Sequence, residues 1–312
     1  LFNEEIRTTM LSFNADIEKF TFPNGGIGLR DVHISEGPGR LIGIMGASGA
    51  GKTTLLNVLA GIEEPGDGTV RINGIDIHRN KDRVRGVIGY VSQDDLLIEE
   101  LTVFDNLYYN AKLCFADSTD EEIRERVLKV LESLGLDQRK YLKVGNPLDK
   151  TISGGQRKRL NIALELIREP AVLFVDEPTS GLSSRDSENV IDLFKELSLK
   201  GKLIYVVIHQ PSSDIYKMFD KMYIMDTGGY PVFYGHPVAA VTYFKQVTNQ
   251  VDSERGQCDN CGNVNPEQIF NIIEARVVDE YGQLTNKRKI SPQGWHEHFK
   301  ENFTLEKVED VK

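Results

Sequence analysis

The chain contains the segment Gly46-Ala47-Ser48-Gly49-Ala50-Gly51-Lys52-Thr53, which has the spacing G-x-x-x-x-G-K-T. It follows the apolar run 41–45, which has the length of a buried strand, and it leads into the helix-forming run 54–60. In that order the backbone N–H groups of the loop and the N-terminus of the helix point at one place, where phosphate can bind. The glycines let the loop close around phosphate without a Cβ in the way. The segment therefore predicts a phosphate-binding loop between a strand and a helix.

The expected nucleotide contacts follow from the side chains of this loop. Lys52 is expected to reach the β- and γ-phosphates, and the Thr53 hydroxyl to hold the Mg²⁺ that bridges them. A glycine-rich turn without a ligand is the alternative, which the order of strand, loop and helix disfavours. The expected nucleotide-binding residues of the loop are Gly46, Ser48, Gly49, Ala50, Gly51, Lys52, Thr53 and Thr54.

Composition limits the class of protein. The 312 residues are 40% hydrophobic and 27% charged, which is typical of a globular protein. The net charge of −10 comes without a basic block, so nucleic acid is not expected as a partner. The longest apolar runs, such as 203–208, have the length of strands and are far short of the ~20 residues that span a bilayer. Three cysteines give no disulfide framework, and because the chain begins with Leu1 we expect it to be a piece of a longer protein.

Hydrophobic periodicity predicts the order of elements. Residues 13–35 alternate around a turn at 22–26, which predicts an antiparallel hairpin, and 69–74 alternate in the same way. Helical spacing begins near residue 102 and continues past Ile152. Apolar runs at 171–175 and 203–208 then alternate with a helix from about Asp186, so we predict an α/β fold. Helices are also predicted at 266–278 and at 291–299, which holds Trp295.

Polar side chains stand at the ends of several predicted strands. Gln93 follows the run 87–91, Asp176 and Glu177 end the run 171–175, and His209 follows 203–208. Two carboxylates at the end of a buried strand are costly unless they serve a cation or a water. These residues are therefore candidates for a ligand site.

A second anion site is predicted at the start of a helix. Ser153-Gly154-Gly155-Gln156 opens the helical run that follows Ile152. The Ser153 hydroxyl can cap this helix, and the hydroxyl and backbone N–H groups together can bind an anion at the positive end of the helix dipole.

These motifs, in this order, resemble the nucleotide-binding domain of an ABC transporter over roughly residues 13–245. The segments 48–61, 152–159 and 176–182 resemble most closely the White/BCRP (G-type) subfamily, and Asn265-Pro266-Glu267 is similar to its Asn-Pro-Ala-Asp segment. The resemblance implies an α/β fold: a P-loop ATPase core with an N-terminal antiparallel β-subdomain and a helical signature subdomain at about 100–168. It implies an ABC-type ATP-binding domain at 1–245 and an appended C-terminal segment at 246–312 that leads to a membrane domain.

The resemblance also implies roles for single residues. Phe22 would stack on adenine, with Phe20 as the alternative stacking residue. Ser153, Gly154, Gly155 and Gln156 would meet the γ-phosphate held by another protomer.

The implied catalytic residues are Glu177, His209 and Gln93, and the implied Mg²⁺ ligands are Thr53, Gln93 and Asp176. Glu177 would polarise the attacking water as general base, and His209 would hydrogen-bond the γ-phosphate. Gln93 would touch both Mg²⁺ and the attacking water, and Asp176 would bind the water shell of the metal.

The implied function is that of the ATP-binding and ATP-hydrolysing domain of an ABC transporter. It would dimerise around two Mg-ATP, as a homodimer or heterodimer, and drive a transmembrane domain of the same or another chain at the cytoplasmic face of a membrane. A soluble ABC-type ATPase of DNA repair or translation is the alternative. An ATPase of DNA repair would insert a long coiled coil between the phosphate loop and the Ser153 motif, yet only about 100 residues without sustained heptads separate Lys52 from Ser153. A tandem ATPase of translation would need a second phosphate loop, and the sequence has none.

Two features stand apart from the implied function. After Ser180-Gly181-Leu182 the family usually carries an aspartate that reaches toward the partner's phosphate loop, whereas this chain has Ser183, with Asp186 one turn later as the other possible source of charge. Cys258-x-x-Cys261 lacks a second ligand pair at zinc spacing, so we expect a plain loop there.

Overall fold

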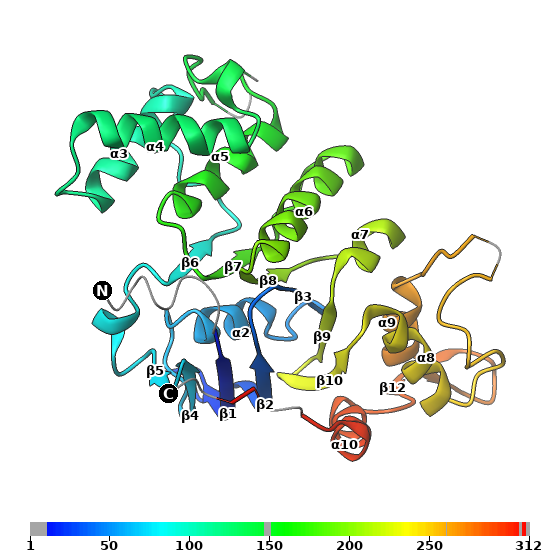
Figure 1. Cartoon of the computed structure of the whole chain (residues 1–312). Helices are drawn as coiled ribbons and strands as arrows, with labels where there is room; N and C mark the ends of the chain where they lie inside the picture. The colour runs from blue at the N-terminus through cyan, green and yellow to red at the C-terminus, as the bar shows by residue number, and fades with distance from the viewer. Residues whose placement is uncertain (1–10, 147–150, 260, 306–307, 310–312) are drawn as a thin grey trace.

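The computed structural model describes residues 11–146, 151–259, 261–305 and 308–309, and Figure 1 shows their arrangement. The outer limits predicted for the two parts of the chain, residues 1 and 312, lie outside this description. The strands are β1 (Phe13–Thr21), β2 (Ile27–Glu36), β3 (Arg40–Gly46), β4 (Asp67–Ile72), β5 (Ile75–Asp76), β6 (Ile88–Val91), β7 (Val172–Asp176), β8 (Leu203–Val207), β9 (Lys221–Asp226), β10 (Tyr230–Gly235), β11 (Arg276–Val278) and β12 (Leu284–Arg288). The helices are α2 (Lys52–Leu59), α3 (Val103–Cys114), α4 (Asp120–Ser133), α5 (Gly154–Leu166), α6 (Ser184–Leu199), α7 (Ser213–Met218), α8 (Pro237–Val247), α9 (Glu267–Ile273) and α10 (Pro292–Asn302), with the 3₁₀ helices η1 (Lys81–Val84) and η2 (Asp137–Arg139).

The central sheet brings the ends of four strands to one edge. Its order is β10-β9-β3-β8-β7-β6, in which β10 is antiparallel to β9 and the other pairs are parallel. Val91 pairs with Val175, Val175 with Val206, and Val206 with Gly43, so β6, β7, β8 and β3 end side by side. In an open parallel sheet the residues that follow such strand ends line the ligand crevice.

The N-terminal antiparallel sheet packs against the central sheet. Its order is β2-β1-β4-β5, and it contains the hairpin and the strand near 69–74 that the alternating sequence predicts. The Phe13 ring on β1 lies 5.9 Å from the Phe174 ring and 5.4 Å from the Tyr205 ring, measured between centroids. Side chains alternate along β3, so Ile42 and Ile44 join this core while Leu41 joins the core on the other face of the sheet. The phosphate loop at the end of β3 is thus anchored from both faces.

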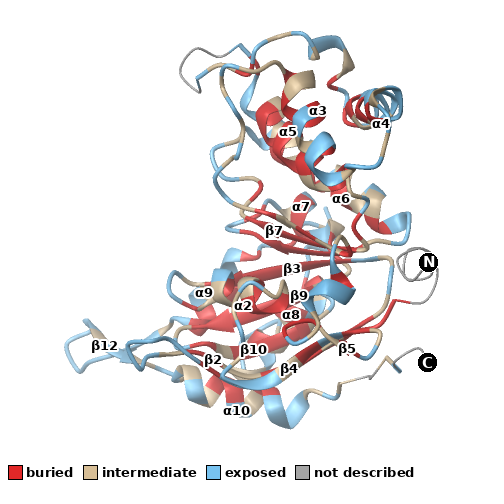
Figure 2. Ribbon diagram, turned by 90° about the vertical axis from the view of Figure 1, so that its left-hand side faces the viewer, coloured by how far each residue is buried: buried red, intermediate tan, exposed pale blue. Residues whose placement is uncertain are grey.

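The helical subdomain consists of α3, α4 and α5 and stands above the β6 and β7 side of the sheet in Figure 1. Each of these helices begins with a hydroxyl N-cap, provided by Thr102, Thr119 and Ser153. Their apolar faces turn toward one another, as the buried residues in Figure 2 show, and they join the core on one face of the central sheet. The subdomain is therefore fixed to the core through packed apolar side chains.

The C-terminal segment packs onto the core. Ile269, Ile273 and Trp295 belong to the same hydrophobic cluster as residues of the central sheet. Arg288 of β12 donates from Nη1 to both carboxylate oxygens of the buried Asp226, at 2.7 and 2.8 Å. These contacts hold α9 and the β11–β12 hairpin against β9.

Two sequence predictions need correction. The helix predicted at 266–278 ends at Ile273, and Arg276–Val278 form strand β11, because Val277 and Val278 favour a strand and the turn closed by Asp279 N–H on the Gln283 carbonyl at 2.9 Å pairs them with β12. Helix α6 begins at Ser184, two residues before the prediction, because Ser183 caps it.

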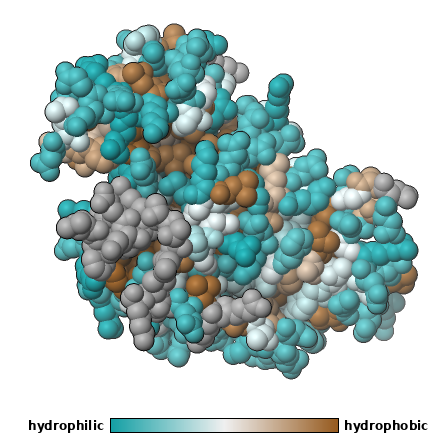
Figure 3. All heavy atoms as spheres, viewed as in Figure 1, coloured by the Kyte–Doolittle hydropathy of each residue, from teal (hydrophilic) through white to brown (hydrophobic). Residues whose placement is uncertain are grey.

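Among the described residues, no helix is long and apolar enough to cross a membrane. The face shown in Figure 3 is mainly hydrophilic, with hydrophobic side chains gathered in the helical subdomain. Large exposed apolar residues include Leu96, Ile98 and Leu113. Leu96 and Ile98 lie on the segment that connects β6 to α3.

Candidate functional site

The phosphate loop has a backbone that only glycine fits at two positions. Gly51 is the N-cap of α2 with φ 93°, and a Cβ there would lie 2.7 Å from the Gly28 carbonyl oxygen. A Cβ on Gly46 would lie 2.7 Å from the Met225 carbonyl oxygen. The Ala50 N–H donates to the Ala47 carbonyl at 3.1 Å and closes the turn. The loop therefore curves tightly around the start of α2, as the G-x-x-x-x-G-K-T spacing predicts.

Lys52 lies inside this loop. Its Nζ donates to the Gly46 carbonyl at 2.9 Å and to the Ala47 carbonyl at 3.1 Å, and the residue is buried. Burial lowers the pKa of the ammonium, while the carboxylates of Glu177 and Asp176 act in the opposite direction. A buried cation near two carboxylates can exchange its carbonyl partners for phosphate oxygens with little movement.

Asp176 has the properties of a metal-site carboxylate. It is buried at the end of β7, and its Oδ1 has no hydrogen-bond partner among the residues that the structure describes. Burial raises the pKa of the carboxyl above its ordinary value, and a side-chain hydrogen bond with Thr53 lowers it in part. A buried carboxylate oxygen that lacks a partner is costly, and a hydrated cation beside it would remove that cost. The donor set of a hydroxyl and a carboxylate fits Mg²⁺, which prefers oxygen ligands and keeps several waters.

Glu177 is held in a strained backbone conformation. Its φ is 43°, in the left-handed region that side chains other than glycine rarely adopt, and its N–H donates to the Val207 carbonyl at 3.1 Å. Its Oε2 accepts a hydrogen bond from Gln93 Nε2 at 3.3 Å. Such strain is kept where the surrounding structure fixes a side chain for a function. The structure thus brings together Lys52, Asp176, Glu177 and Gln93, which come from two strand ends, those of β7 and β6, and from the start of α2.

Helix α5 holds the segment after Gln93 at three points. Lys158 Nζ donates to the Gln93 carbonyl at 2.8 Å, and Asn161 Oδ1 accepts from the Leu96 N–H at 3.1 Å. Arg157 donates to both carboxylate oxygens of Asp95, at 2.7 and 3.3 Å. Sequence reasoning missed these three residues, although a buried lysine and arginine beside the Ser153 motif are the signal that could have indicated them. The segment that carries Gln93 is therefore anchored to the helix that Ser153 caps.

The Ser153 motif forms a capping box. Ser153 Oγ accepts from the Gln156 N–H at 3.1 Å, and Gln156 Oε1 accepts from the Ser153 N–H at 2.9 Å. Within the described part of the chain, no hydrogen bond or ion pair joins residues 153–156 to the phosphate loop. Ser153 and Gly154 are exposed whereas Gly155 is buried, so the accessible end of this helix is formed by the first two residues of the motif.

Phe22 and Phe20 differ in exposure. Phe22 is 37% exposed and Phe20 is 7% exposed, and their rings meet edge to face with centroids 5.2 Å apart. A Cβ on Gly28 would lie 2.7 Å from Phe22 Cε2, so the Phe22 ring covers Gly28, whose carbonyl faces Gly51. Of the two rings, that of Phe22 has the more accessible face, and it borders the phosphate loop.

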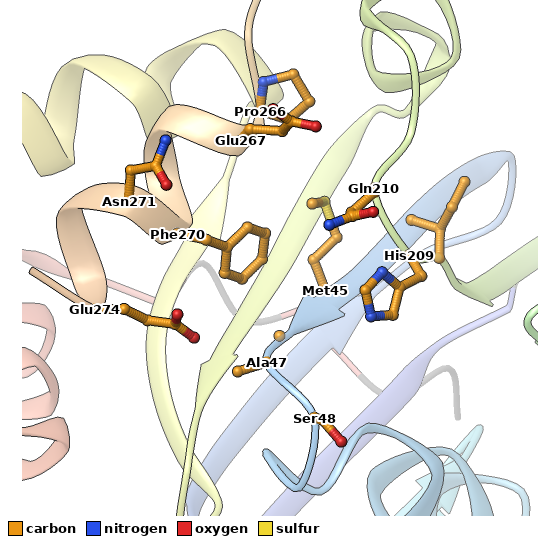
Figure 4. A pocket seen from close by; sticks show the side chains of 12 residues that line it. Met45, Ala47, Ser48, His209, Gln210, Pro266, Glu267, Phe270, Asn271 and Glu274 are labelled. Atoms are coloured by element: carbon orange, nitrogen blue, oxygen red, sulfur yellow. The ribbon is translucent and has the colours of Figure 1, made fainter.

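His209 and Gln210 follow β8 and border a cavity of about 430 Å³. Gln210 has a φ of 43°, which turns the chain sharply at this point. Figure 4 shows the two residues on one side of the cavity, residues of α9 on the other, and Ser48 below. The cavity adjoins the phosphate loop through Gly46, Ala47 and Ser48 but is not lined by Lys52, Asp176 or Phe22. This cavity is therefore separate from the phosphate site but next to it. The sequence did not predict the cavity, although the resemblance at Asn265-Pro266-Glu267 singled out one segment of its lining.

Among the described residues, no group of three or more His, Cys, Asp or Glu side chains is arranged to hold a metal ion.

Comparisons with known proteins agree on one family. Residues 29–180 match the family model described as ABC transporter. The chain is 39% identical to ABC transporter G family member 14 of Arabidopsis thaliana over 212 residues. The aligned region covers 67% of this chain and 32% of that protein. It is 33% identical over 299 residues to ABC transporter G family member 13 of the same plant, covering 93% of this chain and 42% of the relative. A probable ATP-dependent permease of Saccharomyces cerevisiae is 42% identical over 195 residues, covering 61% and 18%. The chain thus spans less than half the length of each of these relatives.

Two solved structures are similar over most of their length. The structure of cbiO1 from Clostridium perfringens, described as part of the ABC transporter complex cbiONQ, gives a TM-score of 0.63 at 25% identity, covering 76% of this chain and 90% of that chain. The ADP conformation of an ATP-binding cassette of an ABC transporter gives a TM-score of 0.64 at 26% identity, covering 73% and 92%.

Proposed function

The chain contains an ABC transporter nucleotide-binding domain, most like those of the G-type subfamily, and from this we propose that it binds and hydrolyses Mg-ATP to drive a membrane domain. The observation that carries the proposal is the convergence of Lys52, Asp176, Glu177 and Gln93 at one sheet edge beside a tightly curved phosphate loop. Phosphoryl transfer needs little covalent chemistry from the protein, so these groups act by positioning and charge.

Binding of ATP falls to the loop and to Phe22. Lys52 pairs with the phosphate oxygens, and the N–H groups at the start of α2 complete the anion site. Phe22 stacks on the base, because its exposed ring borders the loop whereas Phe20 is buried. Thr53 and Asp176 would hold Mg²⁺, and the metal would supply positive charge that offsets the charge of the phosphate oxygens.

Water activation falls to Glu177. Its strained backbone and its hydrogen bond with Gln93 fix the carboxylate at the strand end, where it accepts a proton from a water aimed at the γ-phosphate. His209 donates a hydrogen bond to the γ-phosphate. Because Gln93 is tied to α5 through Lys158, changes at the γ-phosphate are passed to the helical subdomain.

We infer that the complete site needs a second nucleotide-binding domain. Within the described residues the start of α5 makes no hydrogen bond or ion pair with its own phosphate loop, and its free N–H groups suit an anion, so it meets the triphosphate held by a partner domain. The partner is a second copy of this chain or a related chain.

The membrane domain docks on the segment between β6 and α3. Leu96 is 70% exposed and Ile98 is 52% exposed there, and the same segment carries Gln93. Apolar side chains exposed on a segment tied to the site suit a protein partner that must respond to the nucleotide. With such a partner, the domain would act at the cytoplasmic face of a membrane. A soluble ABC-type ATPase is the weaker alternative, because the relatives described above are named as transporters or as a permease.

The test uses two variants with opposite expected effects. Lys52→Ala is expected to abolish tight ATP binding, and Glu177→Gln to keep binding but stop phosphate release. A labelled ATP analogue measures binding, and Lys200→Ala, at the exposed C-terminal end of α6, is the control for loss of a lysine.

Light scattering is expected to show Glu177→Gln as a monomer without nucleotide and a dimer with ATP. Equal ATP affinity in Lys52→Ala, or normal turnover in Glu177→Gln, would contradict the assigned roles.

A further inference from the structure

Arg185 has an unfavourable position in its own chain. It lies in the first turn of α6 and is exposed. A cation at a helix N-terminus opposes the helix dipole and so lowers the stability of the helix. Within the described parts of the chain, no ion pair, side-chain hydrogen bond or cation–π contact involves Arg185. A residue that lowers the stability of its own helix, and that has no partner among the described residues of its own chain, is a candidate for contact with another molecule.

The start of α6 lies against the Ser153 motif. A Cβ on Gly155 would be 2.5 Å from Asp186 Oδ1, and a Cβ on Gly154 would be 3.4 Å from Leu182 Cδ2. Ser183 caps α6 and donates from its hydroxyl to Asp186 at 2.9 Å, so this turn is rigid. Arg185, next to Asp186 in the first turn of α6, therefore lies close to the Ser153 motif.

The cavity beside the phosphate loop is acidic. Glu267 and Glu274 line it from α9, and no lysine or arginine is among its lining residues. The two glutamates are seven residues apart, which places them on one face of the helix two turns apart. Neither forms an ion pair with any described residue. The Gln210 and Asn271 amides and the Phe270 ring complete a space that suits a guanidinium with an apolar stem (Figure 4).

We propose that Arg185 of a second copy of this chain enters this cavity and pairs with Glu267 and Glu274. The inference rests on the proposed ATP-bound dimer, in which the Ser153 motif of each copy faces the phosphate loop of the other. Arg185 lies next to the Ser153 motif, and the cavity lies next to the phosphate loop. When the motif of one copy meets the loop of the other, Arg185 of the first copy therefore approaches the cavity of the second. Two-fold symmetry gives two such contacts in each dimer. They provide a link between copies at the turn where Ser183 replaces the family's usual aspartate.

The test exploits this symmetry in the Glu177→Gln background with ATP present. One chain carries Arg185→Glu, and the other carries Glu267→Lys and Glu274→Lys. Each chain alone is expected to dimerise at least tenfold more weakly than the parent, because like charges then face one another at both contacts. In a mixture every contact of the mixed dimer joins opposite charges, so dimers are expected to return to within about threefold of the parent. Analytical ultracentrifugation of differently labelled chains measures both.

Controls separate this contact from other effects. Lys200→Glu makes the same charge change at the other end of α6 and is expected to leave dimerisation unchanged. Arg185→Glu is expected to keep or raise the melting temperature, because an acidic residue suits a helix N-terminus. If Arg185 contacts the triphosphate instead, Arg185→Glu weakens the dimer but the mixture does not recover, which overturns the proposal. If the Glu177→Gln parent does not dimerise when ATP is added, the proposed dimer and this contact are both wrong. If the parent dimerises with ATP and Arg185→Glu dimerises equally well, only this contact is wrong.

Discussion

Lys158→Met removes one of the three anchors between α5 and the segment that carries Gln93. Lys158 Nζ donates to the Gln93 carbonyl at 2.8 Å, and the Gln93 side chain donates to Glu177 at 3.3 Å. Methionine keeps an unbranched stem of similar length but has no donor. Arg157 and Asn161 keep their contacts with Asp95 and Leu96, so the segment is loosened at one point only.

The expected magnitude follows from this single bond. A hydrogen bond to a charged group contributes about 1.5–3 kcal/mol, which sets a ceiling of about 10- to 150-fold on turnover if all of it serves to position Gln93 and Glu177. Burial lowers the pKa of Lys158, which shows that the ammonium is itself costly to bury, so removing it offsets part of the loss in stability. We therefore expect kcat to fall about tenfold, with a loss of about 1 kcal/mol or less in the free energy of unfolding.

Steady-state ATPase kinetics and a thermal melt check this prediction. KM for ATP is expected to stay within about twofold, because Lys158 does not line the phosphate loop. The matched control is Lys195→Met, which removes a single 2.7 Å contact of a lysine with Asp220 away from the site and is expected to leave kcat unchanged. A kcat for Lys158→Met within twofold of the parent would refute the positioning role, and an equal fall in the control would show that lost stability alone lowers kcat.

Three further outcomes are expected. Burial raises the pKa of Asp176, so the stability that the protonated carboxyl contributes is fully present below the ordinary pKa of 3.8 and is lost as the pH rises through the raised pKa. Nucleotide-free Asp176→Asn should therefore have a higher melting temperature than the parent at pH 7.5, and the difference should shrink on acidification. A lower melting temperature of the variant at pH 7.5 would contradict this. Phe22→Ala should weaken ATP binding by about 1–3 kcal/mol in a titration without changing competition by inorganic triphosphate, whereas Phe20→Ala should mainly lower the melting temperature. Trp295→Ala should lower the free energy of unfolding by about 3–5 kcal/mol in urea, because the ring is fully buried among core residues; a loss under 1 kcal/mol would show that the C-terminal segment does not stabilise the core.

The sequence alone predicted the phosphate loop, the hairpin before it, the helical subdomain and the strand-end residues. Each of these depends on a local pattern, because side-chain alternation, apolar run length and glycine spacing act over a few residues. Strand pairing could also be anticipated, since parallel strands joined by helices bring their carboxyl ends to one edge. The resemblance of the motifs to ABC nucleotide-binding domains, together with these strand-end positions, groups Asp176, Glu177, Gln93 and Lys52 in one site.

The tertiary structure alone decided three matters. The contacts of Lys158, Arg157 and Asn161 join residues more than sixty positions apart, and such contacts depend on how α5 packs over β6. The strand Arg276–Val278 exists because β12 pairs with it, whereas its own sequence also suits the end of a helix. The acidic cavity exists because α9 folds back beside the phosphate loop, about 220 residues earlier in the chain. Local sequence fixes the conformation of short segments, but the distance between segments far apart in the chain is set by packing of the whole core, and the outlying parts of this site depend on those distances.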